Sequence, residues 1–217
     1  MVEWQQIDTV FLDMDGTLLD LNFDTYFWLE HVPLRYSEKH GVPLEEAKAK
    51  LMARYQALLG TIRWYSIDHW SEELELDIAL LKQEVDHLIA VHPYVTDFLD
   101  ALRRHGKRTV LVTNAHMKSL ELKMEKTRLG GHFDRMVVSH DFGLPKEEPD
   151  FWDKLQGVES FEPGRTLLVD DSLPVLRSAR QYGIAWLLAV YEPDTQQPRR
   201  DVEEFEAIET FRDILPS

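Results

Sequence analysis

The chain has 217 residues, a length that suits one α/β domain with an inserted subdomain and is enough to bury a core. Its 24 Lys and Arg against 39 Asp and Glu give a net charge of −15. Such a surface repels polyphosphate backbones, so we expect neither a nucleic-acid polymer nor an anionic membrane as a partner. The absence of Cys excludes disulfides, thiolate zinc sites and phosphatases that use a cysteine nucleophile.

The amino-terminal residues lack the basic and apolar regions of a signal peptide. No apolar run approaches the ~20 residues that a bilayer-spanning helix needs. We therefore expect a cytoplasmic protein. The sequence leaves its oligomeric state open.

The first predicted element is a strand over 9–13, a short apolar run rich in strand-forming residues that Gly16 ends. The pattern then becomes helical from 22 to 92, because apolar residues recur there at helical spacing. They form two sets: Leu44, Ala47, Leu51, Tyr55 and Leu58, and then Ile78, Leu81, Val85 and Leu88. We expect residues 22–92 to form a helical insertion in a core made of 1–21 and 93–217.

Strands and helices alternate from residue 93 onward. Helices are predicted after residue 95 as far as Gly106 and over 116–129, 149–156, 172–183 and 200–208, and strands over 108–113, 136–139, 166–170 and 185–190. This alternation indicates a parallel sheet covered on both faces, that is, a Rossmann-like, doubly wound α/β fold. In such sheets the ligand binds beyond the carboxyl ends of the strands.

Acidic pairs follow two of these strands. Asp13 and Asp15 flank a single residue at the end of the first strand, and Asp170 and Asp171 follow a later one. A turn explains one acid but does not explain why the pattern recurs. Four carboxylates at one sheet edge would repel one another without a cation, and such oxygen ligands suit Mg²⁺. The sequence therefore predicts a magnesium site at this edge.

Two further candidates are less informative alone. Thr113 and Asn114 follow a predicted strand, where a hydroxyl and backbone N–H groups could hold phosphate oxygens, but Thr-Asn is also a common helix start. Lys146 lies in a loop rich in Pro and Gly and could offset negative charge, but a single lysine is normally exposed.

In this order, the motifs resemble those of the haloacid dehalogenase superfamily of phosphohydrolases. The resemblance covers nearly the whole chain, and the helical insertion resembles the cap of that superfamily. It consists of four motifs, which are Asp13-x-Asp15-Gly16-Thr17, Thr113-Asn114, Lys146 and Asp170-Asp171.

The resemblance implies a role for each acid. Asp13 attacks phosphorus and forms an aspartyl-phosphate, and Asp15 protonates the leaving oxygen and then activates water. The Asp13 carboxylate, the Asp15 backbone carbonyl and Asp171 hold Mg²⁺. Asp170 acts through a water molecule or orients Lys146.

The resemblance also implies that Thr113, the Asn114 backbone and Lys146 bind the phosphoryl group, with Thr113 and Lys146 counted as catalytic. Members that cleave carbon–halogen bonds lack an acid at the position of Asp15, so its presence favours phosphate chemistry. A phosphomutase shares all four motifs and stays an alternative, as does a catalytically silent binding module.

Further stretches resemble the purine 5′-nucleotidases of the same superfamily, which implies GMP and IMP as substrates. These stretches are 11–21, 26–28, 64–65, 68–72 and 142–147. A sugar phosphate or another small metabolite is the alternative substrate. A purine could stack on one of the aromatic side chains in 22–92, although each ring could equally belong to a helical core.

Overall fold

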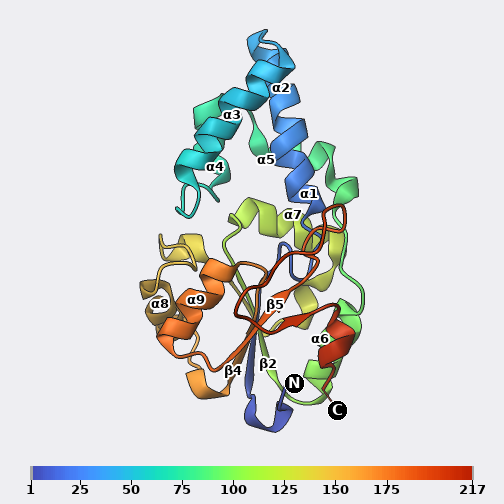
Figure 1. Cartoon of the computed structure of the whole chain (residues 1–217), viewed down its shortest axis with the longest axis vertical. Coiled ribbons are helices and arrows are strands. Elements are labelled where there is room, and N and C mark those ends of the chain that lie inside the picture. The colour runs from blue at the N-terminus through green and yellow to red at the C-terminus, as the bar shows by residue number, and fades with distance from the viewer. Residues whose placement is uncertain (1, 217) are drawn as a thin grey trace.

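The computed structural model describes residues 2–216 and contains a six-stranded, wholly parallel sheet with the order β3-β2-β1-β4-β5-β6 (Figure 1). The strands are β1 Thr9–Leu12, β2 Arg108–Thr113, β3 Arg135–Val138, β4 Thr166–Val169, β5 Trp186–Val190 and β6 Ala207–Ile208. The chain proceeds outward from β1 in one direction and then from β4 in the other, so the topological switch lies between β1 and β4. The predicted doubly wound α/β fold is confirmed.

Helices cover both faces of the sheet. Helices α6 (Val95–Arg104) and α7 (Met117–Thr127) pack on one face, and α8 (Asp150–Val158) and α9 (Leu173–Tyr182) on the other. Strand β1 shows the division, because Val10 and Leu12 join the first hydrophobic cluster and Phe11 joins the second. Burial on both faces explains why this strand is a continuous apolar run.

The segment between β1 and α6 is helical and forms the cap. Its elements are α1 Asn22–Tyr26, the π-helical turn Phe27–His31, α2 Val32–His40, α3 Leu44–Leu58, α4 Ile67–Leu74, α5 Ile78–Glu84 and a 3₁₀ turn Asp86–Leu88. The cap has a hydrophobic cluster of its own, centred on the fully buried Trp70. Figure 1 shows the cap at one end of the molecule and both termini at the other. The boundaries 22 and 92 stay a prediction.

Five 3₁₀ turns complete the structure, at Trp4–Gln6, Leu129–His132, Ser139–Asp141, Pro163–Arg165 and Phe211–Ile214. The helix predicted over 200–208 is wrong, because this segment ends in strand β6. Val202, Phe205 and Ile208 are buried at a spacing of three, which imitates a helix. The segment ends in a strand and not in a helix because it pairs with the edge of β5, where the Ala189 N–H donates to the carbonyl of Glu206 at 2.8 Å.

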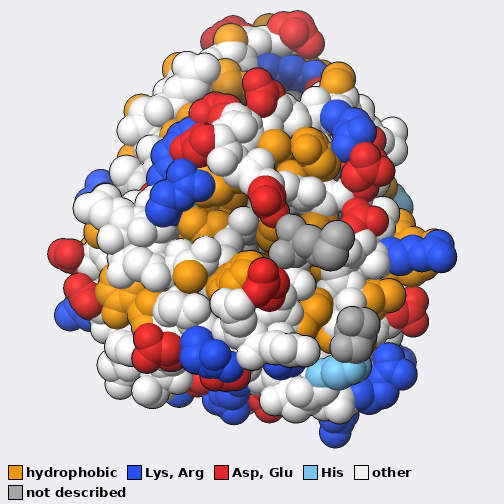
Figure 2. Space-filling model, turned by 60° about the horizontal axis from the view of Figure 1, so that its bottom comes forward, with side chains coloured by type: hydrophobic (Ala, Val, Ile, Leu, Met, Phe, Trp, Pro, Cys, Tyr) orange, Lys and Arg blue, Asp and Glu red, His pale blue; other side chains and the backbone are white. Residues whose placement is uncertain are grey.

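None of the helices formed by residues 2–216 combines the length and the apolar character that crossing a bilayer requires. On the face drawn in Figure 2, acidic and basic side chains are interspersed.

Candidate active site

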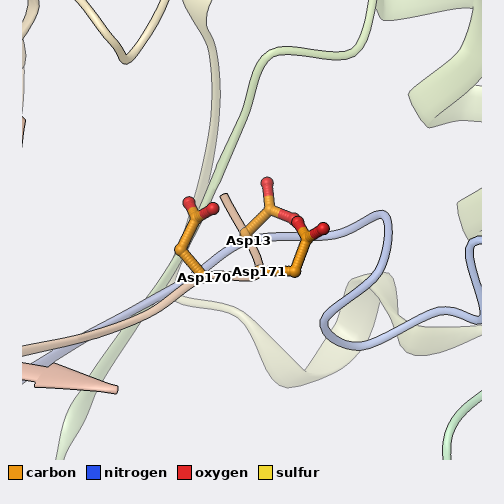
Figure 3. Close-up of side chains that lie close together, drawn as sticks. All are labelled: Asp13, Asp170 and Asp171. Carbon is orange, nitrogen blue, oxygen red and sulfur yellow. The ribbon is translucent and has the colours of Figure 1, made fainter. Parts of the chain in front are cut away.

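The register of β1 and β4 brings the first acids of the two pairs together. Leu12 lies opposite Val169, so Asp13 and Asp170 leave the sheet side by side. The Asp13 N–H donates to the Val169 carbonyl at 3.1 Å. Asp13, Asp170 and Asp171 each present a carboxylate oxygen within 4.8 Å of the others. Figure 3 shows the Asp13 and Asp171 carboxylates directed toward one another, with Asp170 beside them.

This acidic cluster is electrostatically costly. Burial, with the neighbouring carboxylates, raises the pKa of Asp13 and of Asp171 to about 7 and that of Asp170 to about 6. Arg200, from the segment after β5, donates to Asp171 Oδ2 at 3.1 Å but does not offset this burial. A divalent cation among the three carboxylates would offset the remaining repulsion, and an all-oxygen donor set suits Mg²⁺. The residues present therefore fit the predicted metal.

Lys146 is fixed between the acids. It is 2 % exposed, and its ammonium donates to Asp13 Oδ1 at 2.5 Å, Asp170 Oδ2 at 2.7 Å and the Val112 carbonyl at 3.0 Å. These bonds use all three of its donors. Burial alone would lower the pKa of Lys146, but the two carboxylates outweigh burial and raise it. Lys146 is therefore not an exposed surface lysine, which was the alternative that its residue type alone suggested.

Thr113 ends β2 and Asn114 follows it at the same edge of the sheet, and both are buried. The Asn114 carbonyl oxygen Oδ1 accepts from the Lys146 backbone N–H at 2.9 Å, and its Nδ2 donates to Glu147 Oε2 at 2.8 Å. The Asn114 side chain thus holds the Lys146 loop in place. Any contact of Asn114 with a phosphoryl group would therefore involve its backbone, and this contact stays a prediction.

Asp15 differs from the other acids in its surroundings. Its side chain is 22 % exposed, and Oδ1 accepts from the ammonium of Lys123 at 2.6 Å. Lys123 also donates to Asp24 Oδ2 at 2.6 Å, and Lys82 donates to Asp24 Oδ1 at 2.8 Å. The structure thus places Asp15 at the end of a chain of charges that continues into the cap.

Sequence reasoning missed Lys123, Lys82 and Asp24. A signal was present, because Lys123 lies three residues after Leu120 on the apolar face of α7. Lys82 likewise lies four residues after Ile78 on the apolar face of α5. A lysine within an apolar stripe is expected to be buried only with a partner.

A cavity of about 810 Å³ lies above the acids and reaches into the cap. Asp13, Asp15 and Lys146 line it on the core side, and Trp28 and Trp64 line it on the cap side. Trp28 and Trp64 are therefore open to stacking with a ligand in the cavity. Trp70 is not, because it is fully buried in the cap core. The volume lies within the range of ligand-binding pockets for small molecules.

One further contact joins the cap to the core across this cavity. Tyr65, in the loop before α4, donates its hydroxyl to Glu147 Oε1 at 2.6 Å. Burial, and then the Glu147 carboxylate, raise the pKa of Tyr65, so the hydroxyl keeps its proton. The cap loop is therefore attached to the loop that carries Lys146.

The buried acids with their lysine, at the carboxyl edge of a doubly wound sheet beneath a helical cap, are typical of hydrolases that act on small phosphorylated compounds. The family model for haloacid dehalogenase-like hydrolases matches residues 7–183. The chain belongs to this family, whose members generally use Mg²⁺.

The similar proteins include close and distant relatives. The chain is 38 % identical over 216 residues to the GMP/IMP nucleotidase YrfG of Escherichia coli, covering 100 % of this chain and 97 % of the relative. It is 33 % identical over 186 residues to a phosphoglycolate phosphatase of Nitrosospira multiformis, covering 82 % and 80 %. A crystal structure of a phosphatase of this family from Thermococcus onnurineus shares the fold, with a TM-score of 0.81, 23 % identity and 96 % of each chain covered.

These similarities confirm the predicted superfamily and enzyme class, a phosphoric monoester hydrolase. The roles assigned to individual site residues stay predictions. This includes the contact of the Asp15 backbone carbonyl with the metal.

Proposed function

We propose that this protein is a magnesium-dependent 5′-nucleotidase that removes the phosphoryl group from purine nucleoside monophosphates, with GMP and IMP as preferred substrates. The observation that carries the proposal is one cavity that Asp13, Asp15 and Lys146 line from the core and Trp28 and Trp64 line from the cap. The identity of 38 % to a GMP/IMP nucleotidase along the whole chain supports this choice of substrate.

The first half of the proposed reaction transfers the phosphoryl group to Asp13. Its carboxylate attacks phosphorus, and the bond from phosphorus to the 5′ oxygen breaks. Asp15 gives a proton to that oxygen, so that the nucleoside leaves as a neutral alcohol. Lys146 lies 2.5 Å from Asp13 Oδ1 and holds that carboxylate in one orientation, which lowers the entropic cost of the attack.

The second half releases phosphate. Asp15, now ionised, takes a proton from water, and the resulting hydroxide attacks the phosphorus of the aspartyl-phosphate. The bond from phosphorus to the Asp13 oxygen breaks, so that inorganic phosphate leaves and the Asp13 carboxylate is restored. Thr113 and the Asn114 backbone bind the phosphoryl oxygens, and the nearby Lys146 ammonium offsets the charge that develops on them. Asp13, Asp171 and the Asp15 backbone carbonyl would hold Mg²⁺, which would supply further charge neutralisation.

The cap side of the cavity is suited to a flat, apolar base. Trp28 and Trp64 have ring centroids 5.8 Å apart and are only partly buried, so their surfaces are available to a ligand. Leu29 and Leu59 line the same region and are exposed. A purine stacked there would bury more aromatic surface than a sugar could.

A substrate panel tests the proposal. Free phosphate is measured after incubation with GMP, IMP, AMP, UMP, glucose 6-phosphate and 2-phosphoglycolate, each with Mg²⁺ and with a chelator. We expect the highest kcat/KM for GMP and IMP and loss of phosphate release with the chelator. A higher kcat/KM for a sugar phosphate would overturn the substrate assignment.

The same panel separates the two alternatives of other kinds. A phosphomutase would convert a sugar phosphate into an isomer, seen by phosphorus NMR, without net release of phosphate. A catalytically silent binding module would release no phosphate from any compound, p-nitrophenyl phosphate included. We also propose a cytoplasmic location, which fractionation of the cells that make the protein tests.

A further inference from the structure

Four charged side chains form a continuous chain from the core into the cap, in which both lysines are buried and both aspartates are partly buried. Asp15 pairs with Lys123, Lys123 pairs with Asp24, and Asp24 pairs with Lys82, at distances of 2.6, 2.6 and 2.8 Å. Asp15 and Lys123 belong to the core, whereas Asp24 on α1 and Lys82 on α5 belong to the cap. The charges balance, with two carboxylates and two ammonium groups.

This arrangement is poorly suited to stability alone. The side chains of Lys123 and Lys82 are 1 % and 4 % exposed, so both ammonium groups have lost their hydration. Apolar residues in such positions are often as stabilising as a buried ion pair, or more so. Lys82 offsets part of its cost by lying 4.5 Å above the centre of the Phe27 ring. The chain of charges thus points to a role in placing a functional group.

The group that the chain places is Asp15. Lys123 holds Oδ1, while among the described residues 2–216 none donates a hydrogen bond to Oδ2, and the side chain lines the cavity. Asp24 accepts from both lysines and so fixes the Lys123 ammonium from the cap side. Lys123 thus donates to one carboxylate oxygen of Asp15, as Lys146 donates to one carboxylate oxygen of Asp13.

We propose that Lys123 is a positioning residue that directs the free carboxyl oxygen of Asp15 at the leaving oxygen of the substrate, with Asp24 as its anchor on the cap. The inference rests on the proposed function, in which Asp15 is the proton donor. It follows that the contacts of Lys123 with Asp15 and with Asp24 determine both how the cap packs on the core and where the proton donor lies.

Two substrates of nearly equal size test this role. Phenolate is a poor leaving group and needs a proton, whereas p-nitrophenolate leaves readily without one. A misplaced Asp15 should therefore reduce kcat/KM for phenyl phosphate more than for p-nitrophenyl phosphate. Because the two compounds fill the cavity alike, a general disturbance of the cap would reduce both equally.

The decisive variants are Lys123→Met and Lys123→Arg, with Lys118→Met as the matched control. Lys118 also joins α7 to the cap, through Asp68 at 2.6 Å, but this pair is exposed. We expect Lys123→Met to lose at least about tenfold more kcat/KM on phenyl phosphate than on p-nitrophenyl phosphate, a fraction of what general acid catalysis supplies. Lys123→Arg should restore part of this difference, and Lys118→Met should show none.

A combined variant guards against misfolding. Lys123→Met, Asp24→Asn and Lys82→Met together remove Asp24 and both of its partners, so neither buried ammonium group is left without a carboxylate. The free energy of unfolding should therefore recover relative to Lys123→Met with Asp24→Asn, which leaves Lys82 without its partner. We expect the selective loss on phenyl phosphate to persist in this stable protein. If the combined variant regained wild-type kcat/KM on phenyl phosphate, Lys123 would act only by balancing the charge of Asp24 and the inference would be wrong.

Asp15→Asn separates this inference from the proposed function. If Asp15→Asn shows the selective loss on phenyl phosphate and Lys123→Met does not, then only the positioning role of Lys123 fails. If Asp15→Asn loses activity equally on both substrates, then the assignment of Asp15 as proton donor fails, and the proposed mechanism fails with it.

Discussion

Gly16 and Asp171 lie so close together that the backbone of Gly16 defines the position of the Asp171 side chain. A Cβ atom at residue 16 would lie 2.8 Å from Cγ of Asp171 and 2.9 Å from its Oδ2. The φ angle of Gly16, +83°, also disfavours any other residue. Thr17 completes the contact, because its Oγ1 accepts from the Asp171 backbone N–H at 3.1 Å. The loop after β1 thus places the acid that follows β4.

The substitution Gly16→Ala should therefore displace the Asp171 carboxylate and lower both activity and Mg²⁺ affinity. We expect kcat to fall by about a hundredfold, since misplacement by 1 Å at such a site can cost that much. The matched control is Gly41→Ala in the cap, where φ is +65° but none of the described atoms lies within 4 Å of the added Cβ. If kcat fell equally in the two variants, backbone strain alone would explain the effect and the contact with Asp171 would not.

Lys146 should resist replacement even by arginine. Its three acceptors, Asp13 Oδ1, Asp170 Oδ2 and the Val112 carbonyl, match the compact ammonium group. A planar guanidinium cannot reproduce this geometry in a buried site. We expect Lys146→Arg and Lys146→Met each to lose at least about a hundredfold in kcat. Steady-state kinetics with circular dichroism as a folding control measures this, and activity of Lys146→Arg near that of wild type would contradict it.

The sequence predicts the sheet and most of its helices because their signals are local. Strand β2 is found at its predicted residues, 108–113, since its apolar run is bounded by polar residues. The edge at which Asp13, Asp170 and Lys146 meet also follows from the sequence, because parallel strands direct their carboxyl ends to one side.

Contacts between the cap and the core could not be predicted in the same way. The ion pairs of Lys123 with Asp15 and Asp24 depend on how the cap packs against the core, which the periodicity of the sequence does not encode. The end of the chain also misleads, because residues 202–208 have helical spacing but end in strand β6, which pairs with the edge of β5. Each miss is a case in which a tertiary contact outweighs a local pattern.

The stability contributed by Asp24 should depend on pH. Burial would raise its pKa, but Lys123 and Lys82 outweigh burial and lower it from 3.8 to about 2. A lowered carboxyl pKa stabilises the fold above its unfolded value and loses this effect as pH falls toward the folded value. A shift of this size corresponds to about 2 kcal/mol at neutral pH.

Asp24→Asn should accordingly be less stable than wild type by about 2 kcal/mol at pH 6, and the difference should shrink as the pH falls from about 4 toward 2. Urea unfolding at a series of pH values measures it. Asp68→Asn is the control, because that pair is exposed and its loss should cost little. A difference between Asp24→Asn and wild type that stays constant down to pH 2 would contradict the assignment.

Trp64 should contribute to substrate choice more than to chemistry. It lines the cavity on the cap side, away from Asp13 and Asp170. We expect Trp64→Ala to raise KM for GMP by about tenfold, as loss of one stacking contact does, while kcat/KM for p-nitrophenyl phosphate changes little. Leu59→Ala, at the exposed edge of the same cavity, is the milder comparison. Equal losses of Trp64→Ala on GMP and p-nitrophenyl phosphate would exclude stacking.

In the proposed reaction, Asp13 carries the phosphoryl group between the two halves. Rapid acid quench during turnover of GMP, followed by borohydride reduction and mass spectrometry, identifies the phosphorylated residue, because an aspartyl-phosphate is reduced to homoserine. We expect homoserine at position 13 and none in Asp13→Asn, which should also lose turnover. Homoserine at another aspartate, or wild-type turnover by Asp13→Asn, would contradict it.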